Sequence, residues 1–309
     1  MSDLVTEKEL QEARLVGFTP GGHTVLKQLW WKELSKLTGA YGSLDVLHDF
    51  IDAMFYSLNN EHDKVKELPC LAGKDYDKRV RILQRAMRFL GEAMERERFV
   101  DLLGAADQEL RGTKSQSSTG AFYTPDSLCN VMAELTGGKS DPVKAKLERG
   151  EIVTVYDPTV GAGRTLMAFC KQHADHLDQI RAFGTDIEIN AVRMFFVNCA
   201  LNGIAARCVH GNELSNEREW AVYYTPEWHV YEYDRNIKLQ MDKWRALFNG
   251  MYDVAAEHAA TTPQKAQETP EAIEPGNSTP KQENEPIEAT GGYKADVTIE
   301  ADGQMLFNF

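Results

Sequence analysis

Acidic and glycine residues at a spacing typical of ligand-binding turns lie in VYDPTVGAGRTL, residues 155–166. An apolar run leads into Asp157 and Pro158, Gly161 and Gly163 follow, and a helical pattern starts directly afterwards. A glycine-rich turn between a strand and a helix lets the backbone approach a ligand closely, and the N-terminus of the helix adds partial positive charge. The carboxylate of Asp157 favours a ligand that carries an ammonium group.

The spacing of this turn differs from two common phosphate-binding sites. It reads Asp-Pro-x-x-Gly-x-Gly rather than the G-x-G-x-x-G of dinucleotide folds, and no Gly-Lys-Ser/Thr follows as in a phosphate loop. A second acid, Asp186, ends the next predicted strand, where an acidic side chain would bind a ribose hydroxyl pair. An amino-acid cation and a ribose on one ligand describe S-adenosylmethionine. The alternative for the glycines alone is a tight turn without a ligand.

The elements that must position these residues follow from the apolar periodicity. In roughly the first hundred residues, apolar side chains recur at helical spacing, which predicts helices such as 43–58 and 76–103. From residue 151 onward, strand patterns alternate with helical ones, which predicts right-handed βαβ units and a parallel sheet. The expected strands are residues 151–157, 180–187, 206–214 and 220–224, and a last helix is expected at roughly 235–249.

Composition divides the chain into three parts. We predict a helical N-terminal domain over 1–112, a Rossmann-like α/β domain over 113–252 and a disordered acidic tail over 253–309. The polar segment 111–120 is predicted to be a loop at the boundary between the helical domain and the α/β domain. Five of the eleven prolines lie between residues 263 and 286, among side chains that bury too little apolar surface to order the segment.

Charge and cysteine usage narrow the protein class. The formal net charge is −13, without the basic excess of an autonomous nucleic-acid binder. A local basic face is still open, either solvated or in contact with phosphates, and comprises Arg79, Arg81, Arg85 and Arg88. The five scattered cysteines form no CxxC pair, so no metal site or disulfide framework is indicated. No apolar run approaches the ~20 residues of a membrane span, and we expect a soluble, cytoplasmic protein.

Five segments in chain order carry a resemblance to a known family. They are GAFYTP at 120–125, VYDPTVGAGRTL at 155–166, FGTDIEINAV at 183–192, NCALNGI at 198–204 and HGNEL at 210–214. Together they resemble the adenine-N6 DNA methyltransferases, above all the modification subunits of type I restriction systems, over roughly residues 75–230. The resemblance implies a Rossmann-like, S-adenosylmethionine-dependent methyltransferase fold with a partial parallel sheet.

The resemblance also assigns roles by position. The residues that would line the methionine end of the cofactor are Phe122, Tyr123, Thr124 and Pro125. The residues that would form the main cofactor loop are Asp157, Pro158, Gly161 and Gly163. Asp186 would bind the ribose hydroxyls and Ile187 would pack on the adenine ring. Asn212, where the family usually has Asp, would lie near the adenine.

The catalytic motif of the family is altered in this chain. In the family, Asn/Asp-Pro-Pro-Tyr/Phe follows the fourth strand; its acceptors hold the target amine and its aromatic ring stacks on the flipped base. Here the corresponding residues are Thr225, Pro226, Glu227 and Trp228. Trp228 could stack and Pro226 keeps one carbonyl, but the hydroxyl of Thr225 is a poorer acceptor. One interpretation is a variant catalytic loop made by Thr225, Pro226 and Trp228. The other is an ordinary strand-to-loop corner with a buried tryptophan.

Three functions remain open. The first is a DNA adenine-N6 methyltransferase that uses S-adenosylmethionine and, since no target-recognition domain is visible, needs a partner such as a separate specificity subunit to read DNA. The second is a methyltransferase-fold module that binds the cofactor or DNA without transfer, in a regulatory, counter-restriction or complex-subunit role. The third is an unrelated nucleotide-binding α/β protein.

The end of the chain, GQMLFNF, suggests a further partner. Apolar clusters in a polar tail usually mark contact sites. The segment is similar to the short Gln-Leu-x-Leu-x-Phe peptides by which bacterial replication proteins bind the sliding clamp, which would tether the domain to DNA. The residues that would make this contact are Gln304, Met305, Leu306, Phe307 and Phe309. The alternative is that they fold back on the domain as an edge strand or plug a groove.

Overall fold

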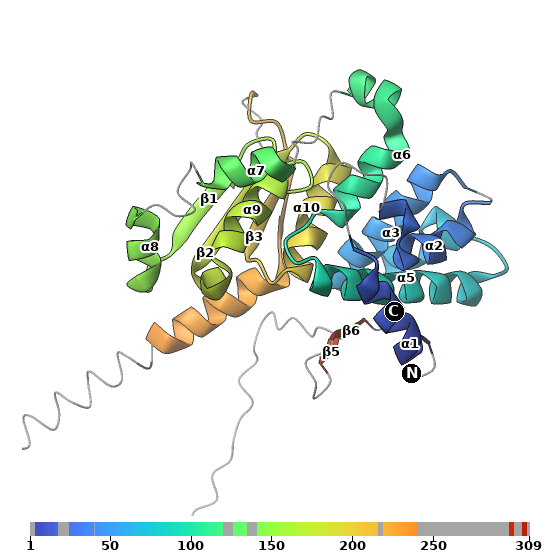
Figure 1. Cartoon of the computed structure of the whole chain (residues 1–309), viewed down its shortest axis with the longest axis horizontal. Helices are drawn as coiled ribbons and strands as arrows, with labels where there is room; N and C mark the ends of the chain where they lie inside the picture. The colour runs from blue at the N-terminus through green and yellow to red at the C-terminus, as the bar shows by residue number, and fades with distance from the viewer. Residues whose placement is uncertain are drawn as a thin grey trace, which may run out of the picture. The chain divides into compact units, whose positions relative to one another are not determined.

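The structure is a computed structural model of the 309-residue chain. It describes residues 4–17, 25–39, 41–119, 126–134, 141–215, 219–239, 241, 297–299 and 305–307. The described residues up to Tyr233 fold as one unit of helices and sheet, and a second unit begins at Asp234. Figure 1 shows the elements in chain order, from blue helices through the green and yellow sheet.

The N-terminal part is helical, as its periodicity predicts. Its longer helices are α1 (Glu7–Leu15), α3 (Ser43–Leu58), α5 (Tyr76–Arg96) and α6 (Leu102–Thr119). Its short helices are η1 (Val25–Lys27), α2 (Leu29–Leu34), η2 (Ser35–Leu37), α4 (His62–Lys66) and η3 (Pro69–Leu71). The helix expected over 76–103 is interrupted after Arg96, because Phe99 takes a positive φ of 63° and turns the chain.

The helix α6 continues where a polar loop was expected over 111–120. Asp101 caps the N-terminus of α6, because its Oδ1 accepts a hydrogen bond from the Gly104 N–H at 2.7 Å. Residues 113–119 contain neither Gly nor Pro, so their polar side chains do not prevent the helix from continuing. The boundary predicted near residue 112 therefore falls inside a helix, and the domain limits stay a prediction.

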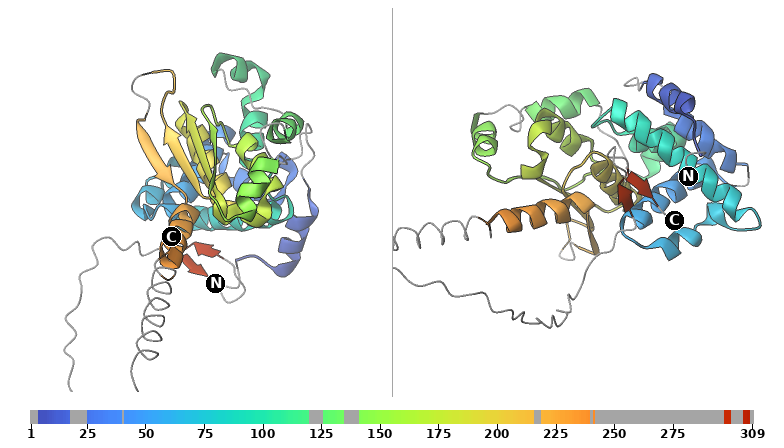
Figure 2. Two further views of the ribbon diagram at one scale, coloured as in Figure 1. Left: turned by 90° about the vertical axis from the view of Figure 1, so that its left-hand side faces the viewer. Right: turned by 90° about the horizontal axis from the view of Figure 1, so that it is seen from below.

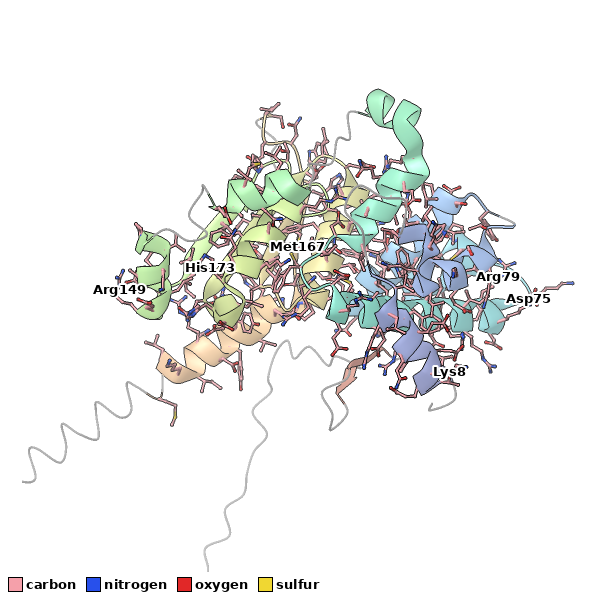
Figure 3. The ribbon with its side chains drawn as sticks, in the orientation of Figure 1. Lys8, Asp75, Arg79, Arg149, Met167 and His173 are labelled. Carbon is pink, nitrogen blue, oxygen red and sulfur yellow. The ribbon has the colours of Figure 1, made fainter. Side chains whose placement is uncertain are left out.

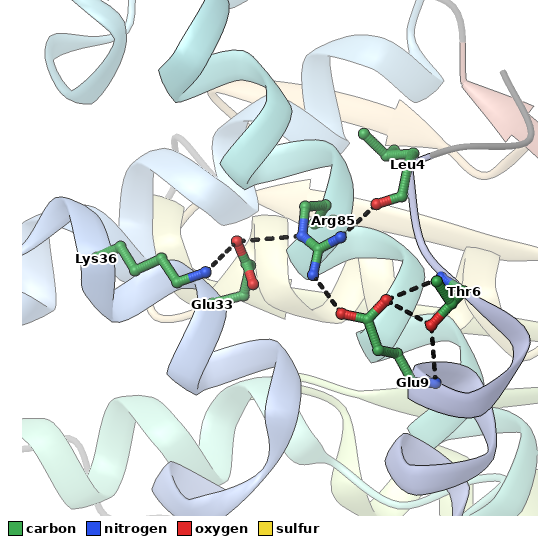
Figure 4. A network of polar contacts seen from close by, with 6 residues as sticks. All are labelled: Leu4, Thr6, Glu9, Glu33, Lys36 and Arg85. Atoms are coloured by element: carbon green, nitrogen blue, oxygen red, sulfur yellow. Dashed lines mark hydrogen bonds and ion pairs between the residues drawn. The ribbon is translucent and has the colours of Figure 1, made fainter.

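Arg85 of α5 connects this helix to α1 and α2 through polar contacts (Figure 4). Its guanidinium donates to Glu9 Oε1 at 2.8 Å, lies 3.3 Å from Glu33 Oε1 and also donates to the Leu4 carbonyl. Glu9 in turn forms a capping box with Thr6 at the start of α1. Arg79 and Arg88 also bond within the protein, to the Cys70 carbonyl and to Glu92. Three of the four arginines singled out as a basic face thus stabilise the helical packing.

The second part is a four-stranded sheet in the order β1-β2-β3-β4. The strands are β1 (Val153–Asp157), β2 (Ile180–Asp186), β3 (Ala206–His210) and β4 (Ala221–Tyr224). The helices of this part are α7 (Asp126–Ala133), α8 (Asp141–Glu148), α9 (Arg164–Gln172), η5 (Ala174–Gln179) and α10 (Ile189–Leu201). The first three strands are parallel and are joined through α9 and α10, which confirms the predicted α/β class.

The direction of β4 is the feature that strand–helix alternation does not predict. β4 pairs antiparallel with β3, so that His210 lies opposite Ala221 and Arg207 opposite Tyr224, and β4 ends the order of the sheet (Figure 2). Only residues 211–220 join the two strands. A parallel return needs a crossover of a dozen or more residues, usually a helix, so this connection can only return antiparallel.

The helical part and the sheet share one hydrophobic core. Phe55 of α3 packs edge-on against Phe196 of α10 and Tyr223 of β4, with ring centroids 5.0 and 4.9 Å apart. Met167 of α9 is also buried in this core (Figure 3), whereas Arg149, next to α8, points outward. Because such aromatic pairs bury large areas with defined geometry, α3 and α10 fix the helical part against the sheet.

The last described elements differ from the expectation. The helix expected at 235–249 already begins at 226 and is described through 239. Of the segment 253–309, the structure describes β5 (Val297–Ile299) and β6 (Met305–Phe307), which pair as a two-stranded sheet, and the predicted disorder of the segment stays a prediction. Gln304 and Phe309 lie outside the described residues. None of the helices that the structure describes is long and apolar enough to cross a membrane.

The capping box of α1 gives a pH-dependent contribution to stability. Hydrogen bonds from the Thr6 backbone and from Arg85 lower the pKa of Glu9 from 4.5 to about 2. A carboxylate with a lowered pKa stabilises the folded state above its unfolded pKa, and this contribution is lost as the pH falls towards about 2. We expect Glu9→Gln to lower the free energy of unfolding at neutral pH by less than about 1 kcal/mol, since Glu9 is partly exposed. Urea unfolding at neutral pH and near pH 3 should show the difference shrinking; an equal difference at both would contradict this role.

Candidate functional site

The predicted cofactor residues that the structure describes gather at the carboxyl ends of the parallel strands. Asp157 ends β1, Asp186 ends β2, and Asn212 follows the end of β3 by two residues. In the sheet register, Asp157 lies beside Gly184 and Asp186 lies beside His210. Ligands of open α/β sheets bind at this edge. Phe122, Tyr123, Thr124 and Pro125 lie outside the described residues.

The glycine turn has the backbone that its sequence suggests. Gly161 and Gly163 take φ values of 55° and 91°, where a side chain is strained. At Gly163 a Cβ would also stand 2.4 Å from the ring of Phe195. Gly163 is the N-cap of α9, so the partly positive end of that helix begins directly at the turn. Both glycines are therefore required by the backbone geometry of this edge.

Asp186 joins the turn to the end of β2. Its Oδ2 accepts a hydrogen bond from the Gly161 N–H at 2.9 Å, and its Oδ1 accepts one from the Glu188 N–H at 2.9 Å. An ionised carboxylate offers about four lone-pair sites, so each oxygen can accept a further bond from a ligand hydroxyl. Ile187, the next residue, is 61% exposed and provides an apolar surface beside that carboxylate.

Asp157 supplies a second negative charge at the same edge. Its Oδ1 accepts a hydrogen bond from the Thr159 N–H at 3.0 Å. Burial raises the pKa of Asp157, and the charge of Asp186 raises it further, although the Thr159 bond opposes the rise. Two carboxylates that disfavour each other's charge are stabilised when a cation binds next to them. This edge therefore suits a cationic ligand.

Several residues that sequence reasoning did not identify hold these loops in place. His210 Nε2 lies 3.2 Å from the Ile187 carbonyl, and Trp220 packs edge-on against His210 at 4.9 Å. Thr185 Oγ1 donates to Glu213 Oε1 at 3.0 Å. Asn212 Oδ1 accepts from the Leu214 N–H at 3.0 Å, which leaves the Asn212 amide group as the donor for a ligand. Of these residues, sequence reasoning gave a role only to Asn212; Thr185, His210 and Glu213 lie in the same quoted segments, but contacts between strands and loops have no signature in sequence spacing.

Thr225 lies at the opposite edge of the sheet. Its backbone N–H donates to the Ala206 carbonyl, its hydroxyl donates to the Ile204 carbonyl at 2.8 Å, and Oγ1 accepts from the Ala206 N–H at 2.9 Å. Its side chain is buried. Ala206 begins β3 and His210 ends it, which separates the two edges by about 13 Å at the usual strand rise. The Thr225 hydroxyl thus closes the sheet rather than facing the cofactor residues.

Pro226 and Trp228 also have structural roles. Pro226 occupies the first position of the helix over 226–239, a position that proline favours. The ring of Trp228 packs against Phe183 at 5.4 Å and Tyr224 at 5.1 Å, and Arg181 lies over it. The segment forms a strand-to-helix corner, as in the second interpretation, although Trp228 is only partly buried. The antiparallel β4 carries this segment away from Asp157 and Asp186, and a catalytic role for Thr225, Pro226 and Trp228 stays a prediction.

Comparison with known protein families gives a match that includes the residues at the carboxyl edge of the sheet. Residues 108–254 match the N-6 DNA methylase family. The match contains the glycine turn, Asp186 and Asn212 and continues past the Thr225 corner. No solved structure matches the chain. The family assignment therefore rests on this segment, and the fold rests on the geometry above.

The contribution of Trp228 to the stability of this strand-to-helix corner can be tested by mutation. Replacing it by Ala removes the ring contacts with Phe183 and Tyr224 and should lower the free energy of unfolding by up to about 3 kcal/mol. The matched control is Trp220→Ala, since Trp220 is half exposed and should contribute less. Urea unfolding compares the two variants. Unchanged stability in Trp228→Ala would contradict the structural role.

Proposed function

Because residues 108–254 belong to the N-6 DNA methylase family, we propose that this protein binds S-adenosylmethionine at the carboxyl edge of its sheet and serves in adenine-N6 methylation of DNA. The observation that carries the proposal is the pair of carboxylates, Asp157 and Asp186, beside the glycine turn. The cofactor site comprises Asp157, Pro158, Gly161, Gly163, Asp186, Ile187 and Asn212, with Phe122, Tyr123, Thr124 and Pro125 proposed for its methionine end.

The chemistry of this ligand matches the edge part by part. The ammonium and sulfonium groups of S-adenosylmethionine are cationic and suit a site with two carboxylates. The ribose hydroxyls can donate to Asp186, which has acceptor capacity beyond its bonds to Gly161 and Glu188. The exposed side chain of Ile187 offers an apolar face for the adenine ring. A phosphorylated nucleotide would instead bring negative charge next to Asp157 and Asp186. This repulsion disfavours the third candidate, an unrelated nucleotide-binding protein.

Removing the ribose-binding carboxylate tests the site. We expect Asp186→Ala to weaken S-adenosylmethionine binding by roughly 1.5–3 kcal/mol, the contribution of charge-assisted hydrogen bonds. Asp186→Asn keeps one acceptor oxygen and should lose less. Asp175→Ala, an exposed acid in η5, is the matched control and should bind as the natural chain does. Isothermal titration calorimetry measures all four proteins; no binding by the natural chain would refute the proposal.

Methyl transfer requires more than the cofactor edge. The target adenine must be flipped out and its amine held by acceptors, and the sequence contains no Asn/Asp-Pro-Pro-aromatic motif. The position of Thr225, bonded to Ala206 and Ile204, favours the second candidate in its complex-subunit form, a module that binds the cofactor or DNA without itself transferring the methyl group. We propose that a partner completes the reaction on DNA. A separate specificity subunit and the sliding clamp stay predictions, as do the regulatory and counter-restriction roles.

A DNA protection assay separates transfer from binding alone. The purified protein, incubated with plasmid DNA and S-adenosylmethionine, should leave the plasmid sensitive to nucleases that adenine methylation blocks. An active adenine methyltransferase in the same assay is the positive control. Protection by the purified protein would contradict the second candidate. Loss of that protection in a folded Trp228→Ala variant would then assign the corner a catalytic role.

A further inference from the structure

Two buried carboxylates at the start of α6 are linked to the two loops of the proposed cofactor site through arginine and asparagine side chains. They are Asp101, which precedes the helix, and Asp107, in its second turn, and both side chains are fully buried. Neither lies in the five segments that carry the family resemblance. Helix α6 contacts both α3 and α10, as Figure 1 shows, so it connects the N-terminal helices with the sheet part.

Asp101 holds the glycine turn. Its Oδ2 accepts from Arg164 Nε at 2.7 Å, and Arg164 is the first residue of α9. Its Oδ1 accepts from Asn198 Nδ2 at 2.8 Å, and the same amide group donates to the Ala162 carbonyl at 3.0 Å. Asp101 is therefore bonded directly to the helix that begins at the turn and, through Asn198, to the backbone of the turn itself.

The backbone of α6 also packs directly on this turn. A Cβ placed on Gly104 would stand 2.6 Å from the Cβ of Ala162 and 2.2 Å from Asp101 Oδ2. Contacts this short leave no room for a side chain at residue 104. The position of α6 and the position of the glycine turn are consequently linked both by hydrogen bonds and by steric contact.

Asp107 holds the second loop. Its Oδ2 accepts from Arg111 Nε at 2.7 Å, and its Oδ1 lies 2.8 Å from His48 Nε2. Arg111 Nη2 then donates to Glu188 Oε1 at 2.5 Å. The backbone N–H of Glu188 is one of the two groups that donate to Asp186. A chain of charge-assisted bonds thus runs from α6 to the proposed ribose-binding carboxylate.

We propose that Asp101 and Asp107 are positioning residues, through which α6 sets the placement of the glycine turn relative to Asp186. Neither touches the ligand; their effect is to hold the two loops in the arrangement that binds it. Holding a site in its bound geometry raises affinity because less ordering is needed on binding. The identity of the ligand rests on the proposed function, whereas the control of loop geometry by α6 does not.

A second buried ion pair provides the matched control. Arg193 of α10 donates to Asp52 of α3 at 2.5 Å, and both side chains are mostly buried. Breaking either this pair or the Asp101 contacts leaves a buried charge without its partner, which destabilises the protein. Asp52 has no bond in the structure to either cofactor loop. A purely structural effect should therefore be common to both variants, and a positioning effect should occur only in Asp101→Asn.

The experiment compares Asp101→Asn, Asp52→Asn and Arg111→Gln in the full chain, at a temperature where each is folded. Hydrogen–deuterium exchange is measured without ligand, and S-adenosylmethionine affinity by calorimetry. In Asp101→Asn, exchange should rise selectively over 159–167 and affinity should fall at least about tenfold, as for lost charge-assisted bonds. In Arg111→Gln, the exchange increase should be confined to 186–192. Asp52→Asn should leave exchange in both loops and the affinity within about twofold of the natural chain, as expected for a site without shared contacts.

Each outcome decides the proposal. Unchanged loop exchange in Asp101→Asn, or losses of affinity that follow thermal stability equally in all variants, would overturn it. If Asp101→Asn does not fold, the loop-specific pattern of Arg111→Gln decides in the same way. If the natural chain binds no S-adenosylmethionine, the proposed function fails, and the exchange measurement alone still shows whether α6 positions the loops.

Discussion

The proposed site depends on the close packing of two glycines against one aromatic ring. Phe195 of α10 is fully buried, and a Cβ on Gly163 or Gly184 would stand 2.4 or 2.6 Å from it. The first glycine belongs to the turn before α9 and the second to the middle of β2. Phe195 therefore sets how closely α10 approaches both, and this packing brings the turn within hydrogen-bond distance of Asp186. Interiors packed this tightly transmit small displacements instead of absorbing them.

The direction of β4 determines that the Thr225 corner lies away from the proposed cofactor site. Because the connection after His210 is short and carries no helix, β4 returns along β3 and ends beside Ala206. The cofactor edge and the Thr225 corner are consequently at opposite ends of one strand pair. The corner gains a structural function there, since Thr225 closes the sheet and Trp228 covers Phe183 and Tyr224. We propose that this protein binds the methyl donor and that a partner binds the methyl acceptor.

The N-terminal helices are connected structurally to the proposed cofactor site. Phe55 joins α3 to α10 through the shared aromatic core, and Asp101 and Asp107 extend the connection from α6 to the two loops. In both cases a residue outside the family-like segments determines the geometry of residues inside them. The helical part is thus more than a neighbouring domain, because the backbone of the glycine turn is bonded to it through Asn198.

The sequence by itself determined the elements and the composition of the cofactor edge. Periodicity predicted the helices and the parallel strands, and Asp157, Gly161, Gly163 and Asp186 could be named because turn and strand-end chemistry is local. The direction of β4 was implicit in the missing helix over 211–220, whereas for Thr225-Pro226-Glu227-Trp228 the sequence left a catalytic loop and a structural corner both open. Tertiary structure alone decided the roles of Asp101, Asp107 and Phe195. Arg164 and Asn198 are dozens of residues away from Asp101, as His48 is from Asp107, so helix packing and not sequence spacing sets these contacts.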